Sequence, residues 1–256
     1  MHQDVVDLRA FYESGLGLVA QRMIRRQLRR LWPDVHGQSV LGFGYATPFL
    51  KPFVPEAERV FAVMPARQGV MPWPAGEPSR VALAEDTALP FPDMSIDRVL
   101  LVHGLEHAED RSGLMREIWR VLSGSGRLMV VVPNRRGIWA RFDRTPFGHG
   151  QPYSGSQLSR MLRTDLFVPA REARALFIPP FRARFLLAAA TAWEELGQHW
   201  FSGFAGVVMI EASKQIYQLS ATRAQARQRR RVLVPMPGTM APARHAALRD
   251  RPRDCG

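Results

Sequence analysis

The chain has 256 residues and a single cysteine, Cys255. One cysteine cannot form an internal disulfide or a cysteine-based zinc site, which excludes the small disulfide-stapled secreted folds. The sequence also lacks a secretory signal, because its first seven residues include two aspartates and no apolar block follows them. Its most apolar helical segment, residues 185–193, is far shorter than the roughly 20 residues that cross a bilayer. These absences predict a soluble, cytoplasmic protein.

Acidic residues are few relative to basic ones: 23 Asp and Glu stand against 35 Lys and Arg, a formal net charge of +12. The excess is concentrated in residues 220–256, where nine arginines and two aspartates occur. This tail is rich in proline and has little apolar periodicity, which is typical of disorder. It is either a solvated tail or an electrostatic contact for RNA or an acidic membrane surface.

A second basic cluster lies in an early helical pattern with a clear apolar stripe. We interpret its arginines as the solvated face of that helix. They are Arg22, Arg25, Arg26, Arg29 and Arg30.

From residue 38 onward, short apolar runs alternate with helical patterns. Continuous apolar strands separated by helices indicate an α/β fold with a mostly parallel sheet covered on both faces. Such sheets bind ligands beyond the carboxyl ends of their strands. Glu211 and Lys214, at the end of the last run, are expected to reach solvent. We expect strands at residues 39–44, 59–64, 81–84, 97–103, 126–132 and 205–212, and helices at 105–122, 156–164 and 181–197.

Residues 81–134 carry an ordered set of motifs: EDTALPFPD at 85–93, SID at 95–97, LEH at 105–107 and EIWRVLSGSGRL at 117–128. In order and spacing this set resembles the class I S-adenosylmethionine (SAM)-dependent methyltransferases, specifically the type 11 group. The resemblance implies a Rossmann-like, seven-stranded, mostly parallel sheet with helices on both faces, an antiparallel last hairpin, and SAM as cofactor. We therefore expect a methyltransferase-like domain over residues 1–219, with an N-terminal helical extension at about 7–34 and the tail at 220–256.

The cofactor loop that the resemblance implies departs from the family pattern. The family has an acidic residue followed by x-Gly-x-Gly-x-Gly, whereas residues 42–48 here read GFGYATP. Pro48 removes an amide donor but is tolerated in the first turn of a helix. The carboxylate that the family offers to the ribose is replaced by Met64, while the adenine side keeps Glu85. The implied cofactor-binding residues are Gly42, Phe43, Gly44, Tyr45, Ala46, Thr47, Met64, Glu85, Asp86 and His103.

Two histidines and a glutamate gather after the fourth expected strand, at His103, Glu106 and His107. His107 is a candidate general base for a hydroxyl or amine acceptor, because imidazole titrates near neutral pH. The alternative is that this turn only satisfies local backbone groups. A His-x-x-Glu-His string is short and arises often by accident, so we predict no metal site.

The segment after the fifth expected strand, residues 134–154, mixes Arg, His and aromatic residues with Gly and Pro. Long loops of this kind are usually functional or disordered. As a substrate lid it would offer Asn134, Arg135, His149 and Tyr153 to an acceptor. The alternative is a structural cap over the sheet.

The predicted function is methyl transfer from SAM to an unidentified acceptor, with a small molecule favoured. One alternative is a catalytically inactive protein on the same fold that binds or regulates a protein partner, since Gly42, Pro48 and Met64 depart from the family. A second is an RNA-associated methyltransferase, on the strength of the basic helix and the basic tail.

Overall fold

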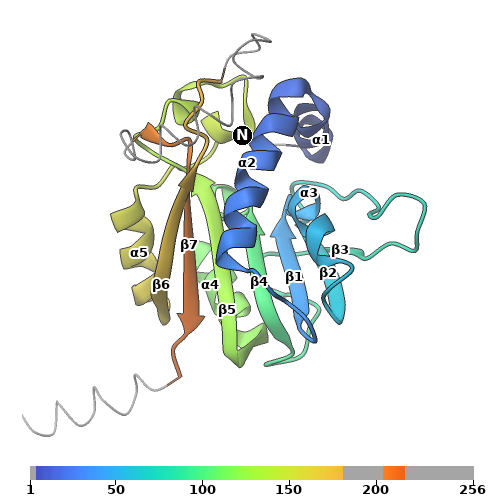
Figure 1. The fold of residues 1–256 in the computed structure, drawn as a ribbon. Helices are drawn as coiled ribbons and strands as arrows, with labels where there is room; N and C mark the ends of the chain where they lie inside the picture. The colour runs from blue at the N-terminus through green and yellow to red at the C-terminus, as the bar shows by residue number, and fades with distance from the viewer. Residues whose placement is uncertain (1–3, 181–203, 217–256) are drawn as a thin grey trace, which may run out of the picture. The chain divides into compact units, whose positions relative to one another are not determined.

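The computed structural model describes residues 4–180 and 204–216. Its centre is a sheet of seven strands in the order β3-β2-β1-β4-β5-β7-β6 (Figure 1). Strands β1 to β5 are parallel, and β7 is antiparallel to both of its neighbours. This confirms the predicted fold class. The strands are β1 (Ser39–Gly44), β2 (Arg59–Pro65), β3 (Val81–Ala84), β4 (Ile96–Val102), β5 (Leu122–Pro133), β6 (Phe167–Ala175) and β7 (Val207–Lys214).

Helices cover both faces of the sheet, and each face has its own apolar core. One core holds α1 (Val5–Glu13), α2 (Gly15–Leu31) and α3 (Thr47–Leu50), and α2 runs across the front of the sheet in Figure 1. The other core holds α4 (Arg111–Val121) and α5 (Gly155–Thr164). Four 3-10 turns complete the described elements: η1 (Lys51–Phe53), η2 (Leu105–His107), η3 (Trp139–Arg141) and η4 (Pro146–Gly148).

The predicted N-terminal extension is two helices joined at Ser14. The Ser14 hydroxyl donates to Phe11 O at 2.6 Å, and its oxygen accepts from Gly17 N at 3.1 Å. Serine is a favoured N-cap because its oxygen satisfies an otherwise unpaired amide. The corner brings the last turn of α1, including Tyr12, to the carboxyl ends of β1 and β4, where Tyr12 contacts Tyr45 and His103.

Most expected elements are present, and two differ. The helix expected over 105–122 is instead η2 followed by α4, which begins where Asp110 caps Gly113 N at 2.8 Å. Strand β6 was not expected, because its sequence FVPAREARA is half-polar and contains Pro169. An edge strand tolerates both features. The helix expected at 181–197 and the tail at 220–256 lie outside the described residues.

No helix in the described ranges combines the length and the apolar character that crossing a membrane requires.

Toward the amino ends of the parallel strands, β7 carries a fully buried carboxylate, Glu211. Its Oε1 accepts from Trp32 Nε1 at 3.0 Å, and its Oε2 accepts from Arg171 Nε at 2.6 Å. Arg98 and Arg127 lie at 3.5 and 3.7 Å. Burial acts to raise the pKa of Glu211, but the hydrogen bond from Arg171 and the charges of Arg171 and Arg127 outweigh it, so the pKa lies below its usual range.

The expectation that Glu211 and Lys214 reach solvent is therefore wrong. Strand β7 lies between β5 and β6, so its polar residues are enclosed. Lys214 is 7% exposed, and its Nζ donates to Leu122 O at 2.8 Å. The same ammonium lies 3.9 Å from the ring centre of Trp119, a cation–π contact.

Candidate functional site

The turn after β1 brings backbone into close contact with β4. Gly44 has φ +80°, and a Cβ there would lie 2.2 Å from Val102 O. Only glycine takes this conformation at so short a separation. The backbone geometry of this turn therefore depends on Gly44.

Two departures from the family's loop pattern compensate each other. A Cβ at Gly42, where the family has its acid, would lie 2.7 Å from Ala46 Cβ and 2.6 Å from Leu50 Cδ1. The methyl group of Ala46 thus occupies the space that a side chain at position 42 would need. The loss of the acid and the replacement of a glycine by Ala46 belong to one packing arrangement.

A cavity of about 780 Å³ lies beside this turn and the end of β2. Binding sites for small molecules commonly have volumes of about 300–1,000 Å³. From the predicted cofactor set, Tyr45, Thr47 and Met64 line it. Other parts of its wall are Tyr12 of α1, Gln21 and Arg25 of α2, Lys51, and the segment 71–77.

Next to this cavity, the end of β4 is covered by side chains. His103 is 1% exposed, and its Nε2 lies 2.7 Å from the hydroxyl of Tyr12. Its Nδ1 lies 3.1 Å from Glu106 Oε1, and its carbonyl accepts from Gln68 Nε2 at 3.1 Å. In this geometry the Tyr12 hydroxyl can donate to Nε2 while Nδ1 donates to Glu106. Burial and the charge of Glu106 raise the pKa of Tyr12 well above its usual value, so it is a neutral phenol.

An aromatic cluster completes the closure of β4, that is, the cover of side chains over its carboxyl end. Tyr12 stacks on Tyr45 with ring centres 5.7 Å apart, and Phe147 packs on His103 at 5.1 Å. Trp139 in turn contacts Phe147 at 5.4 Å. The hollow that remains beside His103 and Gln68 has a volume of about 20 Å³, enough for about one water molecule.

The structure thus divides the predicted cofactor residues into two groups. Tyr45, Thr47 and Met64 face the large cavity, whereas Asp86 and His103 line the small hollow and Glu85 is exposed. The remaining four, Gly42, Phe43, Gly44 and Ala46, are buried in β1 and its turn. His107 also lines the small hollow, and its role as a general base stays a prediction.

The candidate substrate residues do not converge on one pocket. Asn134 is 3% exposed, and its Nδ2 donates to Ala205 O at 2.7 Å. Tyr153 is buried in the opposite core, Arg135 is exposed, and His149 Nε2 lies 2.7 Å from Asp143 O. These contacts suit a cap over the sheet, and the substrate role of the four residues stays a prediction.

Sequence reasoning missed Tyr12 and Gln68 and treated Arg25 as solvated. Arg25 is half-buried, and its Nε donates to Pro48 O at 2.7 Å. Gln21, one helical turn earlier, also donates to Pro48 O, at 3.2 Å. The four-residue spacing of these two side chains is the one local sign that they share a helix face.

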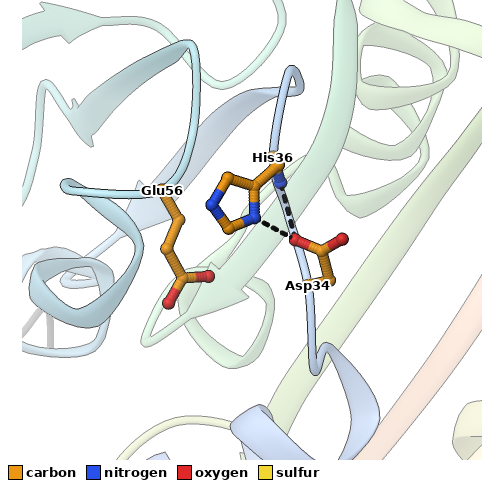
Figure 2. A group of neighbouring side chains, drawn as sticks. All are labelled: Asp34, His36 and Glu56. Atoms are coloured by element: carbon orange, nitrogen blue, oxygen red, sulfur yellow. Dashed lines mark hydrogen bonds and ion pairs between the residues drawn. The ribbon is translucent and has the colours of Figure 1, made fainter.

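One group of side chains has the spacing of metal ligands: Asp34, His36 and Glu56, before β1 and β2 (Figure 2). Asp34 Oδ1 accepts from His36 N at 2.9 Å and pairs with its Nδ1. The backbone and side-chain hydrogen bonds from His36 lower the pKa of Asp34, and the side-chain bond raises the pKa of His36. Both oxygens of Glu56 accept from Arg29, each at 2.8 Å. Because Arg29 already neutralises Glu56, and the other two side chains are exposed, the group is explained without a metal.

The comparisons with known proteins agree with this fold. The sequence model of the methyltransferase-domain family matches residues 42–130. A "Probable S-adenosylmethionine-dependent methyltransferase" of Mycobacterium tuberculosis is 46% identical over 63 residues, 25% of this chain and 22% of that protein. A demethylmenaquinone methyltransferase of Thermus thermophilus is 30% identical over 109 residues, 42% of this chain and 49% of that protein. The matched segments therefore span less than half of either relative.

Solved structures extend the likeness beyond the matched segment. A methyltransferase of Haloferax volcanii, in complex with the activator Trm112, superposes with a TM-score of 0.60 at 15% identity, over 82% of this chain and 99% of that one. A SAM-dependent methyltransferase of Thermotoga maritima gives 0.57 at 17% identity, over 82% and 96%. At these identities the likeness concerns the fold. The motifs within residues 42–130 and the described fold are thus those of class I SAM-dependent methyltransferases.

Proposed function

We propose that this chain transfers a methyl group from SAM to a small-molecule acceptor in the cavity of about 780 Å³ beside Tyr45 and Met64. One observation carries the proposal: the cavity lies where the turn that corresponds to the family's cofactor loop meets the end of β2. The carboxyl ends of strands are where open α/β sheets bind their ligands.

The residues on the cavity wall fit the adenosyl part of the cofactor. Tyr45 and Trp73 offer aromatic surfaces, and Met64 and Met71 offer polarisable thioethers. These four side chains would hold a purine. Asp86 and His103, two other positions of the predicted cofactor set, line the small hollow and do not contribute to this cavity.

When bound, SAM supplies a methyl group that is already attached to a sulfonium leaving group, so catalysis consists mainly in alignment and exclusion of water. The stacked rings of Tyr12 and Tyr45 form one apolar wall. Burial raises the pKa of Tyr45 to about 12, so both rings stay neutral at physiological pH. This wall would limit the access of water to the reacting atoms.

Titration of the full chain with S-adenosylhomocysteine tests the proposal. We expect saturable heat exchange with the native protein. Met64→Trp should fill the cavity and abolish binding, whereas Met94→Trp, at a residue 63% exposed outside the cavity, should leave it unchanged. No binding to the native chain at millimolar ligand would refute methyl transfer.

A second function has its own support. The closure of β4 by Tyr12 and Gln68 favours a protein that uses this fold for binding rather than for catalysis. Isolation of one stoichiometric protein partner from cells, with no S-adenosylhomocysteine binding, is the result expected in that case. Cofactor binding by the native chain would count against it.

A further inference from the structure

The cavity beside Tyr45 has an unbalanced charge on its wall. Five ionisable side chains line it besides the tyrosines: Arg9, Glu13, Arg25, Lys51 and Glu77. Arg9 pairs with Glu13 at 2.7 Å, and Glu77 lies 3.5 Å from Arg80, which is outside the cavity lining. Among the described residues, neither Arg25 nor Lys51 has a carboxylate partner. The wall therefore presents two cations that no acid in the described part of the chain neutralises.

Arg25 is held in place by the turn that it faces. Its Nε donates to Pro48 O at 2.7 Å, and a second nitrogen of the guanidinium donates to the same carbonyl. Burial lowers the pKa of Arg25, and no acid opposes that effect. A partly buried cation that is bonded only to a neutral carbonyl keeps an uncompensated charge, which an anion would satisfy with charge-assisted hydrogen bonds.

The rest of the wall suits an apolar body. Besides the four side chains proposed to hold the purine, Tyr12 supplies a ring, and Leu18 and Pro48 supply aliphatic surface on the same wall as the half-buried arginine. A ligand with a flat apolar body and an anionic group at one end would satisfy both parts of the wall at once.

We propose that the acceptor carries an anionic oxygen group, a carboxylate or a phosphate, which pairs with Arg25 and Lys51 while its apolar body lies against Leu18 and Pro48. The identification of this ligand as the acceptor rests on the proposed methyl transfer. The binding itself does not.

Three matched probes test the charge preference on the full chain at low salt: 2-naphthoate, 2-naphthyl phosphate and the neutral 2-naphthamide. We expect at least one anionic probe to bind about tenfold tighter than the amide, the effect of one charge-assisted contact. The tighter of the two anions identifies the group. Equal affinity for all three probes would overturn the inference.

Substitutions test which residues cause the preference for anionic probes. Arg25→Met and Lys51→Met should each reduce it, whereas Arg22→Met, on the exposed side of the same helix, should not. Lys51 is exposed, so its variant stays informative if Arg25→Met fails to fold. A preference that survives both substitutions would overturn the inference.

Titration of the same samples with S-adenosylhomocysteine separates the two proposals. Cofactor binding without a preference for anionic probes would refute only the inference of an anionic acceptor. A preference for anionic probes without cofactor binding would refute methyl transfer, and the anion-binding site would remain supported. If Arg25→Met lowered the affinity for S-adenosylhomocysteine and for 2-naphthoate equally, the arginine would pair with the carboxylate of the cofactor itself. That result would overturn the proposal of an anionic acceptor.

Discussion

The two ends of the parallel sheet treat their buried carboxylates differently. At the amino end, both oxygens of Glu211 are bonded, by Trp32 and by Arg171. At the carboxyl end, Gln68 Oε1 and Glu106 Oε2 are buried without a hydrogen-bond partner among the described residues. Buried polar atoms are normally bonded, and exceptions call for an explanation such as a missing ligand or water. The comparison teaches that the buried carboxylate at the amino end has both oxygens bonded, whereas the one at the carboxyl end has only one oxygen bonded within the described residues.

The largest effect is expected at the amino end. Glu211→Gln removes a buried charge that three arginines surround, so the free energy of unfolding should fall by about 3–5 kcal/mol. Urea denaturation measures it. Glu172→Gln is the control, because Glu172 pairs with Arg174 at 2.8 Å in a partly exposed position, and it should cost no more than about 1 kcal/mol. If both substitutions lowered the free energy of unfolding equally, burial of Glu211 would contribute nothing to the strength of its ion pairs.

Acid denaturation gives a second check on Glu211. Its folded pKa lies below the unfolded value of 4.5. The stabilisation is therefore complete above the unfolded pKa and is lost as the pH falls through the folded one. Between about pH 5 and pH 3, the native chain should lose more stability than Glu211→Gln. If both proteins lost the same stability as the pH fell, the lowered pKa of Glu211 would be contradicted.

The two ends of β1 allow a matched glycine test. Gly44→Ala, at the carboxyl end, would place a Cβ 2.2 Å from Val102 O at φ +80°, and should cost about 2–4 kcal/mol. Gly37→Ala, just before the strand, has φ +67° but nothing within 4 Å, so only the conformational cost of about 1–2 kcal/mol applies. Thermal unfolding of both proteins compares them, and a larger cost at Gly37 would refute the close-contact argument.

Closure of β4 is tested by Tyr12→Phe. The change keeps the ring stack on Tyr45 but leaves His103 Nε2 buried without its donor, which should cost about 1–3 kcal/mol. Tyr153→Phe is the control, because Tyr153 is a buried tyrosine whose hydroxyl makes no hydrogen bond within the described residues, and it should change little. Chemical denaturation measures both, and identical stabilities would mean that the Tyr12–His103 bond is not formed.

The smallest effect should come from Glu106→Gln, the same substitution as at Glu211 but at the opposite end of the sheet. The amide oxygen can still accept from His103, and the buried negative charge disappears, so stability should change by less than about 1 kcal/mol. A loss as large as that of Glu211→Gln would remove the contrast between the two ends.

Much of the fold could be predicted from local patterns. The apolar runs at 39–44 and 59–64 became β1 and β2, and the ordered motifs between 85 and 128 indicated the family before any contact was known. Strand β6 was missed because it lies at the sheet edge and alternates weakly. Edge strands do not need the continuous apolar run that marks a central strand.

The site was predicted less completely. Tyr45, Thr47 and Met64 line one cavity because they follow directly from strand ends, and their contact with the cofactor stays a prediction. The closure of β4 could not be predicted, because Tyr12 and His103 are 91 positions apart in the chain. The partial burial of Arg25 depends on Pro48, 23 positions away, although the helix pattern alone indicated a solvated face.

By itself the sequence determined which segments become strands, their order along the chain, and the family to which the motifs belong, because these depend on short-range patterns. Only the tertiary structure decided which charged groups are enclosed and paired. Trp32, Arg98 and Arg171 reach Glu211 from 179, 113 and 40 positions away. Burial and ion pairing depend on neighbours in space, and no local pattern specifies them.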